Sequence, residues 1–370
     1  MGINAIFDWK TWAAVPFHFW SLCFFVFGTI VGSFLNVCIY RMPLDLSVIS
    51  PPSHCPKCKY AIPFYLNIPL VTWLSLGGRC KNCGEPISPR YFIVELITGL
   101  FFLICWLSFG HTSAWLALVY CIFIAGLITA TFIDFEHFII PDEITLGGAV
   151  VGFIASFFLP NLLQGGHKAV EGALWSLLGI GFGAGMVYGI LRLGKLLFGR
   201  HKMKIPPQGE IVFSDTTLCL GGKEIPYEEI FHRKSDIITF EAKTVELVDR
   251  GYKNVSVRLS ASALWIGDEQ IDPEGVHHME VVAEEITLPR EAMGLGDVKF
   301  MAAIGAFLGW KGALFSLMAS SVIGAAAGTA MIIFRRREWS SKMPYGPYIA
   351  LAALIWVFFH QQIMHAIFRT

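Results

Sequence analysis

The chain has 370 residues, of which 55% are hydrophobic and only 15% charged, and its mean hydropathy is +0.58. This composition excludes an ordinary soluble globular protein and indicates an integral membrane protein, with the lipid bilayer as its surroundings. Acidic and basic residues balance at 28 each, and we predict no nucleic-acid partner.

Eight apolar segments follow one another along the chain. A membrane-spanning helix needs about 20 mainly apolar residues. The segments that meet or approach this length are 17–40, 91–109, 113–133, 143–159, 170–198, 296–308, 312–334 and 346–368. The start of the chain lacks the basic stretch and cleavage site of a removable signal peptide, so we expect the first segment to stay in the membrane. The sequence predicts an all-α polytopic membrane protein with about eight transmembrane helices.

The orientation of these spans follows from their basic flanks. Lys and Arg cluster in three connections, 41–90, 192–204 and 335–342. Connections rich in Lys and Arg stay in the cytoplasm, and an assignment of eight spans places all three on one side. We therefore expect these connections to be cytoplasmic and both termini to lie outside.

Two polar regions interrupt the apolar segments. Residues 41–90 form a proline-rich loop, and residues 205–290 contain short alternating apolar stretches with two candidate hairpins, at 218–225 and 263–271. From 210 to 290 there are 16 acidic and 8 basic residues, as in a solvated domain. The predicted regions are a first transmembrane segment (1–40), a cytoplasmic loop (41–90), transmembrane helices 2–5 (91–204), an inserted cytoplasmic β-rich domain (205–290) and transmembrane helices 6–8 (291–370).

The first loop carries two C-x-x-C pairs, Cys55 with Cys58 and Cys80 with Cys83. Four thiolates suit a tetrahedral Zn²⁺ ion, and a site without an open position is usually structural. Two disulfides are the alternative, but the reducing cytoplasm disfavours them. The sequence thus predicts a structural zinc loop.

Two carboxylates stand at the ends of apolar segments. Asp134 ends the third span and Asp297 begins the sixth, so the predicted topology places both at the cytoplasmic face. An acid this close to hydrocarbon is costly to keep ionised, which makes it a candidate for function. Two facing carboxylates share a proton, so that one activates a water molecule and the other polarises a peptide carbonyl.

Other interpretations of the acids were weighed against this one. Asp297 fits a helix N-cap, but capping does not explain Gly294 and Gly296 just before it, which leave room for another chain to come close. Asp142, after Pro141, is expected to be the N-cap of the fourth span, and Glu136 to lie in the polar interface.

With these residues assembled, the chain resembles the bacterial type IV prepilin peptidases, aspartic membrane proteases of the GxGD type that also methylate their product. The resemblance covers nearly the whole chain except the insert. It rests on Gly32–Val37 and Tyr40–Pro43, the two C-x-x-C pairs with 67–71 and 77–80, Arg90–Leu96, Asp134 with Pro141 and Asp142, 294–297 with Lys299, and 344–348.

The resemblance implies a function and its residues. These enzymes cleave the leader peptide of prepilins or pseudopilins in the inner membrane, for type IV pilus assembly or type II secretion, and then methylate the new N-terminus with S-adenosylmethionine. By position, Asp134 and Asp297 are the catalytic pair and the four cysteines hold Zn²⁺. The expected supporting residues are Gly294, Gly296, Lys299, Pro344 and Gly346, and the candidates for methyl transfer are Gly78 and Glu95.

Two competing functions were considered. A transporter with Asp134 and Asp297 as an ion relay predicts acids near the middle of the bilayer rather than at one face. A non-catalytic zinc-loop scaffold leaves 294–297 unexplained. The insert at 205–290 departs from the family pattern, and we expect it to contact a substrate, a secretion-system component or another copy of the chain.

Overall fold

The computed structural model describes residues 16–160, 168–198, 200–205, 211–214, 217–220, 223–227, 230–231, 237–247, 250–260, 262–276, 278–289, 294–334 and 343–368. The chain forms two compact units, one of Met1–Val187 with Leu295–Thr370 and the other of Tyr188–Gly294.

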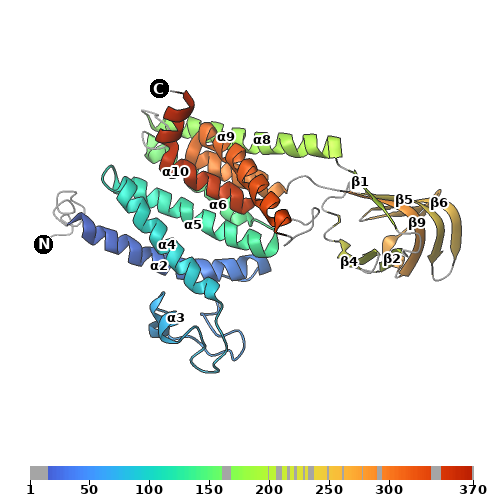
Figure 1. The fold of residues 1–370 in the computed structure, drawn as a ribbon, viewed down its shortest axis with the longest axis horizontal. Coiled ribbons are helices and arrows are strands. Elements are labelled where there is room, and N and C mark those ends of the chain that lie inside the picture. Colours follow the sequence, from blue (N-terminus) through green and yellow to red (C-terminus); the bar gives the residue numbers. More distant parts are fainter. Residues whose placement is uncertain are drawn as a thin grey trace. The chain divides into compact units, whose positions relative to one another are not determined.

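The first unit is a bundle of long apolar helices (Figure 1). They are α2 (Phe17–Arg41), α4 (Pro89–Phe109), α5 (Ala114–His137), α6 (Asp142–Phe158), the first part of α8 (Ala169–Phe198), α9 (Leu295–Ile333) and α10 (Gly346–Phe368). Six helices of the described chain are long and apolar enough to cross a membrane. This confirms a polytopic membrane protein, whereas the number of eight crossings stays a prediction. The difference lies in α6, which has only 17 residues, and in α9, which accounts for both the sixth and the seventh predicted span.

Helix α9 folds back on itself at Gly309. This residue has φ 67° and ψ −177°, outside helical values and in a region that favours glycine. A Cβ atom built at Gly183 of α8 would collide with the carbonyl oxygen of Met301 and lie 3.5 Å from the Cβ of Ala313. Twelve residues of straight helix would separate Met301 and Ala313 by about 18 Å. The chain therefore reverses at Gly309, and the two limbs of α9 correspond to the two predicted segments.

The position of α5 matters most for function. About 67% of its most apolar window is buried, against 39% or less in the other five candidate spans. It packs against α2, α4, α6 and α10. A polar residue on this helix is consequently enclosed by protein, and Asp134 stands near its C-terminal end.

The second unit contains an antiparallel sheet. Its strands are β1 (Arg200–Lys204), β2 (Ile211–Ser214), β3 (Thr217–Leu220), β4 (Lys223–Pro226), β5 (Ile237–Leu247), β6 (Gly251–Ser260), β7 (Leu264–Ile266), β8 (Glu269–Ile271) and β9 (His278–Pro289). Their order is β4-β3-β2-β9-β5-β6-β7-β8, and β1 pairs with β9. Apolar side chains alternate along β5 and pack in one core with those of its neighbours. Both predicted hairpins are confirmed, as β3–β4 and β7–β8.

Candidate active site and metal centre

Asp134 is held at the junction of two helices. Its side chain is buried, with 6% of the residue exposed. One carboxylate oxygen, Oδ2, accepts a 2.8 Å hydrogen bond from the backbone N–H of Gly346, the first residue of α10. A helix N-terminus stabilises a carboxylate because its free N–H groups and its dipole both favour negative charge. A Cβ atom at position 346 would stand 2.7 Å from the same oxygen, so only glycine permits this approach.

A buried isoleucine connects Asp134 to the start of α9. Ile140 is 7% exposed and lies between α5 and α6. A Cβ atom at Gly346 would lie 3.1 Å from its Cδ1 atom, and one at Gly296 would lie 3.6 Å from its Cβ atom. Gly346 touches Asp134, and Gly296 is the neighbour of Asp297. The end of α5 and the starts of α9 and α10 therefore converge around one side chain.

Packing constrains Gly296 and Gly346 to different degrees. At position 296 an added Cβ would make only ordinary contacts, 3.6 Å or longer, with its neighbours. Packing therefore does not require glycine at 296 as it does at 346. The expectation that Gly296 leaves room for something outside the bundle stays a prediction.

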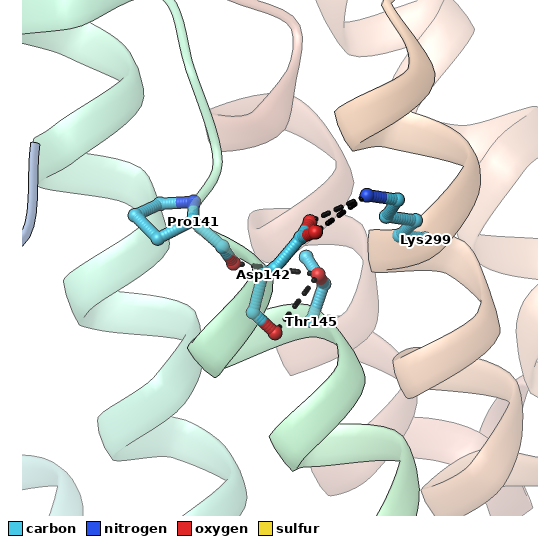
Figure 2. Close-up of polar contacts among 4 residues, drawn as sticks. All are labelled: Pro141, Asp142, Thr145 and Lys299. Atoms are coloured by element: carbon cyan, nitrogen blue, oxygen red, sulfur yellow. Dashed lines mark hydrogen bonds and ion pairs between the residues drawn. The ribbon is translucent and has the colours of Figure 1, made fainter.

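Lys299 lies two residues after Asp297 and reaches across to α6. Its Nζ atom donates to both carboxylate oxygens of Asp142, at 2.6 and 2.7 Å (Figure 2). The expectation that Asp142 is an N-cap is wrong: Pro141 holds the N-cap position, and Asp142 is the first helical residue and makes no capping bond. Its side chain is committed to Lys299 instead, which fixes the first turn of α9 to α6.

The other nearby acid also has a basic partner. Glu136, one residue before the end of α5, forms an ion pair with Arg90 at the start of α4. Asp134, by contrast, has no basic partner in the described part of the chain and accepts from a backbone amide. Of these three acids, only Asp134 is thus left without a neutralising cation, and it is the one best placed to exchange a proton.

The remaining predicted supporting residues divide between the two units. Pro344 is buried directly before α10, and the hydroxyl of Tyr345 lies 2.8 Å from that of Ser320 on α9, which fixes the start of α10. Asp297 is partly exposed in the first turn of α9. Gly294, exposed, is the last residue of the second unit.

The four cysteines form a compact cluster in the loop between α2 and α4. All four sulfur atoms lie within 4.8 Å of one another. The Sγ atoms of Cys55 and Cys83 are 3.8 Å apart, and those of Cys58 and Cys80 are 4.0 Å apart. All four thiols are free. A tetrahedral ion with Zn–S distances of about 2.3 Å would place sulfurs about 3.8 Å apart, so the cluster fits zinc.

The two cysteine knuckles are the same structure repeated after 25 residues. In the first, Cys55 N donates to Tyr60 O and Lys59 N to Cys55 O; in the second, Cys80 N donates to Glu85 O and Gly84 N to Cys80 O. The flanking bridges repeat as well, His54 with Ala61 and Arg79 with Pro86. An ion pair between Lys57 and Glu85 joins the halves. The loop is thus two copies of one cysteine-containing turn.

The surroundings of Cys58 and Cys80 favour thiolates, whereas burial and the neighbouring thiols raise the pKa of Cys83 to about 12. The side-chain amide of Asn82 and the backbone N–H of Tyr60 lower the pKa of Cys58 to about 6. Backbone N–H groups of Cys83 and Asn82 likewise lower the pKa of Cys80. Neighbouring thiolates repel one another unless a cation lies between them, and a divalent metal supplies that charge.

Glu95 and Gly78 occupy different environments. Glu95 is 8% exposed in the second turn of α4. Its Oε2 atom accepts a 2.7 Å bond from the N–H of Leu70, and the Ser33 hydroxyl also contacts the carboxylate. Gly78 has φ 67°, and an added Cβ would lie 2.9 Å from the ring of Trp73. The contacts of Gly78 therefore explain its identity by packing, whereas those of Glu95 leave a buried charge to be explained.

Comparison with known proteins places this arrangement in a family. A model described as the type IV leader peptidase family matches residues 121–203 and 248–329, and one described as the bacterial peptidase A24 N-terminal domain matches residues 26–109. Together they include Asp134, Asp297 and all four cysteines. The chain belongs to the type IV leader peptidase family. It is therefore a peptidase of this family rather than a transporter or a scaffold.

Individual relatives agree with this assignment. The prepilin leader peptidase/N-methyltransferase of Aeromonas hydrophila is 28% identical over 92% of both chains. That of Neisseria gonorrhoeae is 34% identical over 48% of this chain and 67% of its own. That of Myxococcus xanthus is 42% identical over 40% of this chain and 44% of its own. No solved structure matches the chain.

The sequence identified most of these residues but missed several. Ile140, the Lys299–Asp142 pair and the Arg90–Glu136 pair were not predicted as contacts. A signal for Ile140 existed, since the whole connection between α5 and α6, residues 138–141, is apolar. The ion pairs join residues 46 and 157 positions apart, a separation that local patterns do not encode.

Proposed function

We propose that the chain cleaves the leader peptide of prepilins or pseudopilins with Asp134 and Asp297 as the catalytic pair. The observation that carries the proposal is the convergence of Asp134, Gly346 and Gly296 on Ile140, while Glu136 and Asp142 are held by basic partners. One carboxylate would activate a water molecule and the other would protonate the departing amine. Lys299, Pro344 and Gly346 would hold the cluster, and Gly294 and Gly296 would leave space for an extended substrate.

The catalytic pair is tested with purified enzyme and a prepilin-type peptide. Asp134→Asn and Asp297→Asn should each lower cleavage by about 10²-fold or more, because each removes a proton-transferring group. Glu136→Gln is the matched control: it changes an acid two residues from Asp134 that pairs with Arg90. Cleavage by either aspartate variant at the wild-type rate would refute the pair.

We also propose a second activity, N-methylation of the residue exposed by cleavage. The names of the relatives include N-methyltransferase. S-adenosylmethionine would supply a methyl group to the new N-terminal amine, which loses a proton as the carbon–sulfur bond breaks. Glu95 would act close to the donor, and Gly78 by shaping the loop. Transfer of label from S-adenosylmethionine to the cleaved peptide tests this, and cleavage without label transfer would remove the proposal.

Structural zinc and cellular placement complete the proposal. Zn²⁺ on Cys55, Cys58, Cys80 and Cys83 would fold the loop without taking part in cleavage. The enzyme would lie in a bacterial inner membrane with this loop and the β-rich unit in the cytoplasm, and serve type IV pilus assembly or type II secretion. The insert at 205–290 would contact a substrate, a secretion component or a second copy of the chain.

A further inference from the structure

A cavity of about 490 Å³ opens between α2 and the first half of the zinc loop. Its walls include Ser33, Val37 and Arg41 of α2, and Val48, Pro52 and Asn67 of the loop. The volume lies within the range of about 300–1,000 Å³ that is usual for small-molecule sites. Its lining is mostly apolar with a few polar groups, which is also typical of such sites.

Arg41 is a buried cation in the lining of this cavity. The residue is 7% exposed. Its guanidinium donates to two backbone carbonyls, that of Ser47 at 2.9 Å and that of Pro51 at 2.7 Å. Within the described part of the chain no carboxylate pairs with it. A buried charge is costly unless an opposite charge meets it, and a guanidinium offers five N–H donors. The free donors suit a carboxylate or another small anion.

Glu95 lies next to the cavity, bonded to one of its lining residues and outside the lining itself. Its two contacts are the Ser33 hydroxyl, from a residue that lines the cavity, and the N–H of Leu70, which follows the lining residue Pro69. None of the described basic residues pairs with Glu95. Ser33 and Arg41 are eight residues apart on α2, or about 12 Å.

We propose that this cavity binds S-adenosylmethionine. A buried cation in the lining, a buried anion bonded to the lining residue Ser33, and apolar surface around them fit a ligand with a carboxylate, a positive centre and a flat apolar ring. Arg41 binds the carboxylate of the methionyl group, Glu95 stabilises the positive charge near the sulfonium, and the proline-rich wall packs against the adenine. The proposal rests on the methyl transfer proposed above.

The cavity also lies at the end of the bundle that holds Asp134, Glu136 and their neighbours. Helix α4 carries Glu95 and, five residues earlier, Arg90, which pairs with Glu136 near the end of α5. Asp134 is two residues before Glu136. The methyl donor and the peptide bond to be cut are therefore placed at the same end of the helices, as successive steps on one substrate require.

Binding is measured directly, with labelled S-adenosylmethionine and the purified, zinc-loaded full chain in detergent. Val48→Trp fills the cavity and should weaken binding by about tenfold or more, since the ligand loses the space it needs. Leu46→Trp is the matched control: the same change two residues away, at a residue 51% exposed and outside the cavity lining. It should bind as the wild type does. Zinc content and thermal unfolding report whether each variant is folded.

A second comparison distinguishes recognition of the ligand carboxylate by Arg41 from a purely structural role of Arg41 in the loop. In the wild type, decarboxylated S-adenosylmethionine should bind about tenfold or more weakly, because it lacks the anion that Arg41 meets. In Arg41→Gln that difference should vanish. If Arg41 only holds the loop, the substitution weakens both ligands equally and the preference remains.

The outcomes distinguish this proposal from the one it rests on. A wild-type chain that cleaves its substrate but neither binds nor transfers the labelled methyl group overturns both methylation and the cavity. A wild-type chain that binds and methylates, with Val48→Trp binding equally well, overturns the cavity alone. Retention of the carboxylate preference in Arg41→Gln overturns the role of Arg41.

Discussion

The zinc loop, residues 41–90, and the acidic cluster around Asp134 are built in different ways in this peptidase. In the loop the backbone of each half is local: Cys55 bonds with Lys59 and Tyr60, and the second half repeats the pattern 25 residues later. In the acidic cluster the residues that meet come from distant parts of the sequence. Asp134, Gly296 and Gly346 come from α5, α9 and α10, and they meet only because the helices pack. The loop should therefore tolerate changes in the bundle, and the cluster should be sensitive to changes of a single atom.

After the two aspartates themselves, the largest effect is expected at the contact between α10 and α5. Gly346→Ala places a Cβ atom 2.7 Å from Asp134 Oδ2, so the helix must shift and the 2.8 Å bond to the carboxylate is lost. A hydrogen bond to a charged group contributes about 1.5–3 kcal/mol, which predicts a loss of roughly ten- to hundredfold in kcat/KM. Steady-state cleavage of a prepilin peptide measures it.

The control for this substitution is the same change where space is open. A Cβ atom at Gly147 of α6 would meet nothing within 4 Å, so Gly147→Ala should leave cleavage unchanged. Equal losses in both variants would show that the effect comes from α-helix propensity or insertion into the membrane, not from Asp134.

Metal removal tests the independence of the two regions. Chelation, or Cys55→Ser, should open the loop, because binding energy at a structural zinc site is folding energy. Limited proteolysis should then cut within 41–90, while cleavage of a prepilin peptide is largely retained. Cys219→Ser, in β3 of the other unit, is the matched control and should change neither readout. Loss of cleavage in step with loss of zinc would instead show that the loop positions α5, with the Arg90–Glu136 pair as the route.

A smaller effect is expected from the pair that ties α9 to α6. Lys299 and Asp142 are 39% and 55% exposed in their side chains, so their direct contribution to stability should be below about 1 kcal/mol. Asp142→Asn should lower kcat/KM by several-fold, about 1 kcal/mol or less in the barrier, because α9 carries Asp297 in its first turn. The exchanged pair, Asp142→Lys with Lys299→Asp, should recover part of this loss. A double-mutant cycle with no coupling energy would contradict a positioning role.

The same comparison explains what could be read from the sequence. C-x-x-C spacing is a local signal, so the clustering of the four cysteines could be predicted, and the alternation of apolar residues predicted the hairpins of the β-rich unit. Asp134 and Asp297 were found by a topological argument that needs only the end of each span. Ile140 and the partners of Glu136 and Asp142 were missed because they depend on side-chain packing between helices. The reversal at Gly309 was missed for another reason: in sequence the two limbs of α9 read only as two adjacent apolar segments.

The repeated knuckle provides the finest test, because its two halves differ at one backbone position. Lys59 has φ 58° where the equivalent residue of the second half, Gly84, has φ 72°. A non-glycine residue in the left-handed region costs roughly 1 kcal/mol, so Lys59→Gly should relieve strain and Gly84→Ala should introduce it. The gain from Lys59→Gly is partly offset by the greater freedom of glycine in the unfolded loop. We therefore expect a net stabilisation of the zinc-loaded loop below about 1 kcal/mol, measured by competition with a chelator. Lys81→Gly, at an exposed position of the second knuckle without positive φ, lacks this relief and should weaken zinc retention slightly or leave it unchanged. If both lysine variants weaken it equally, backbone strain at Lys59 does not distinguish the two halves.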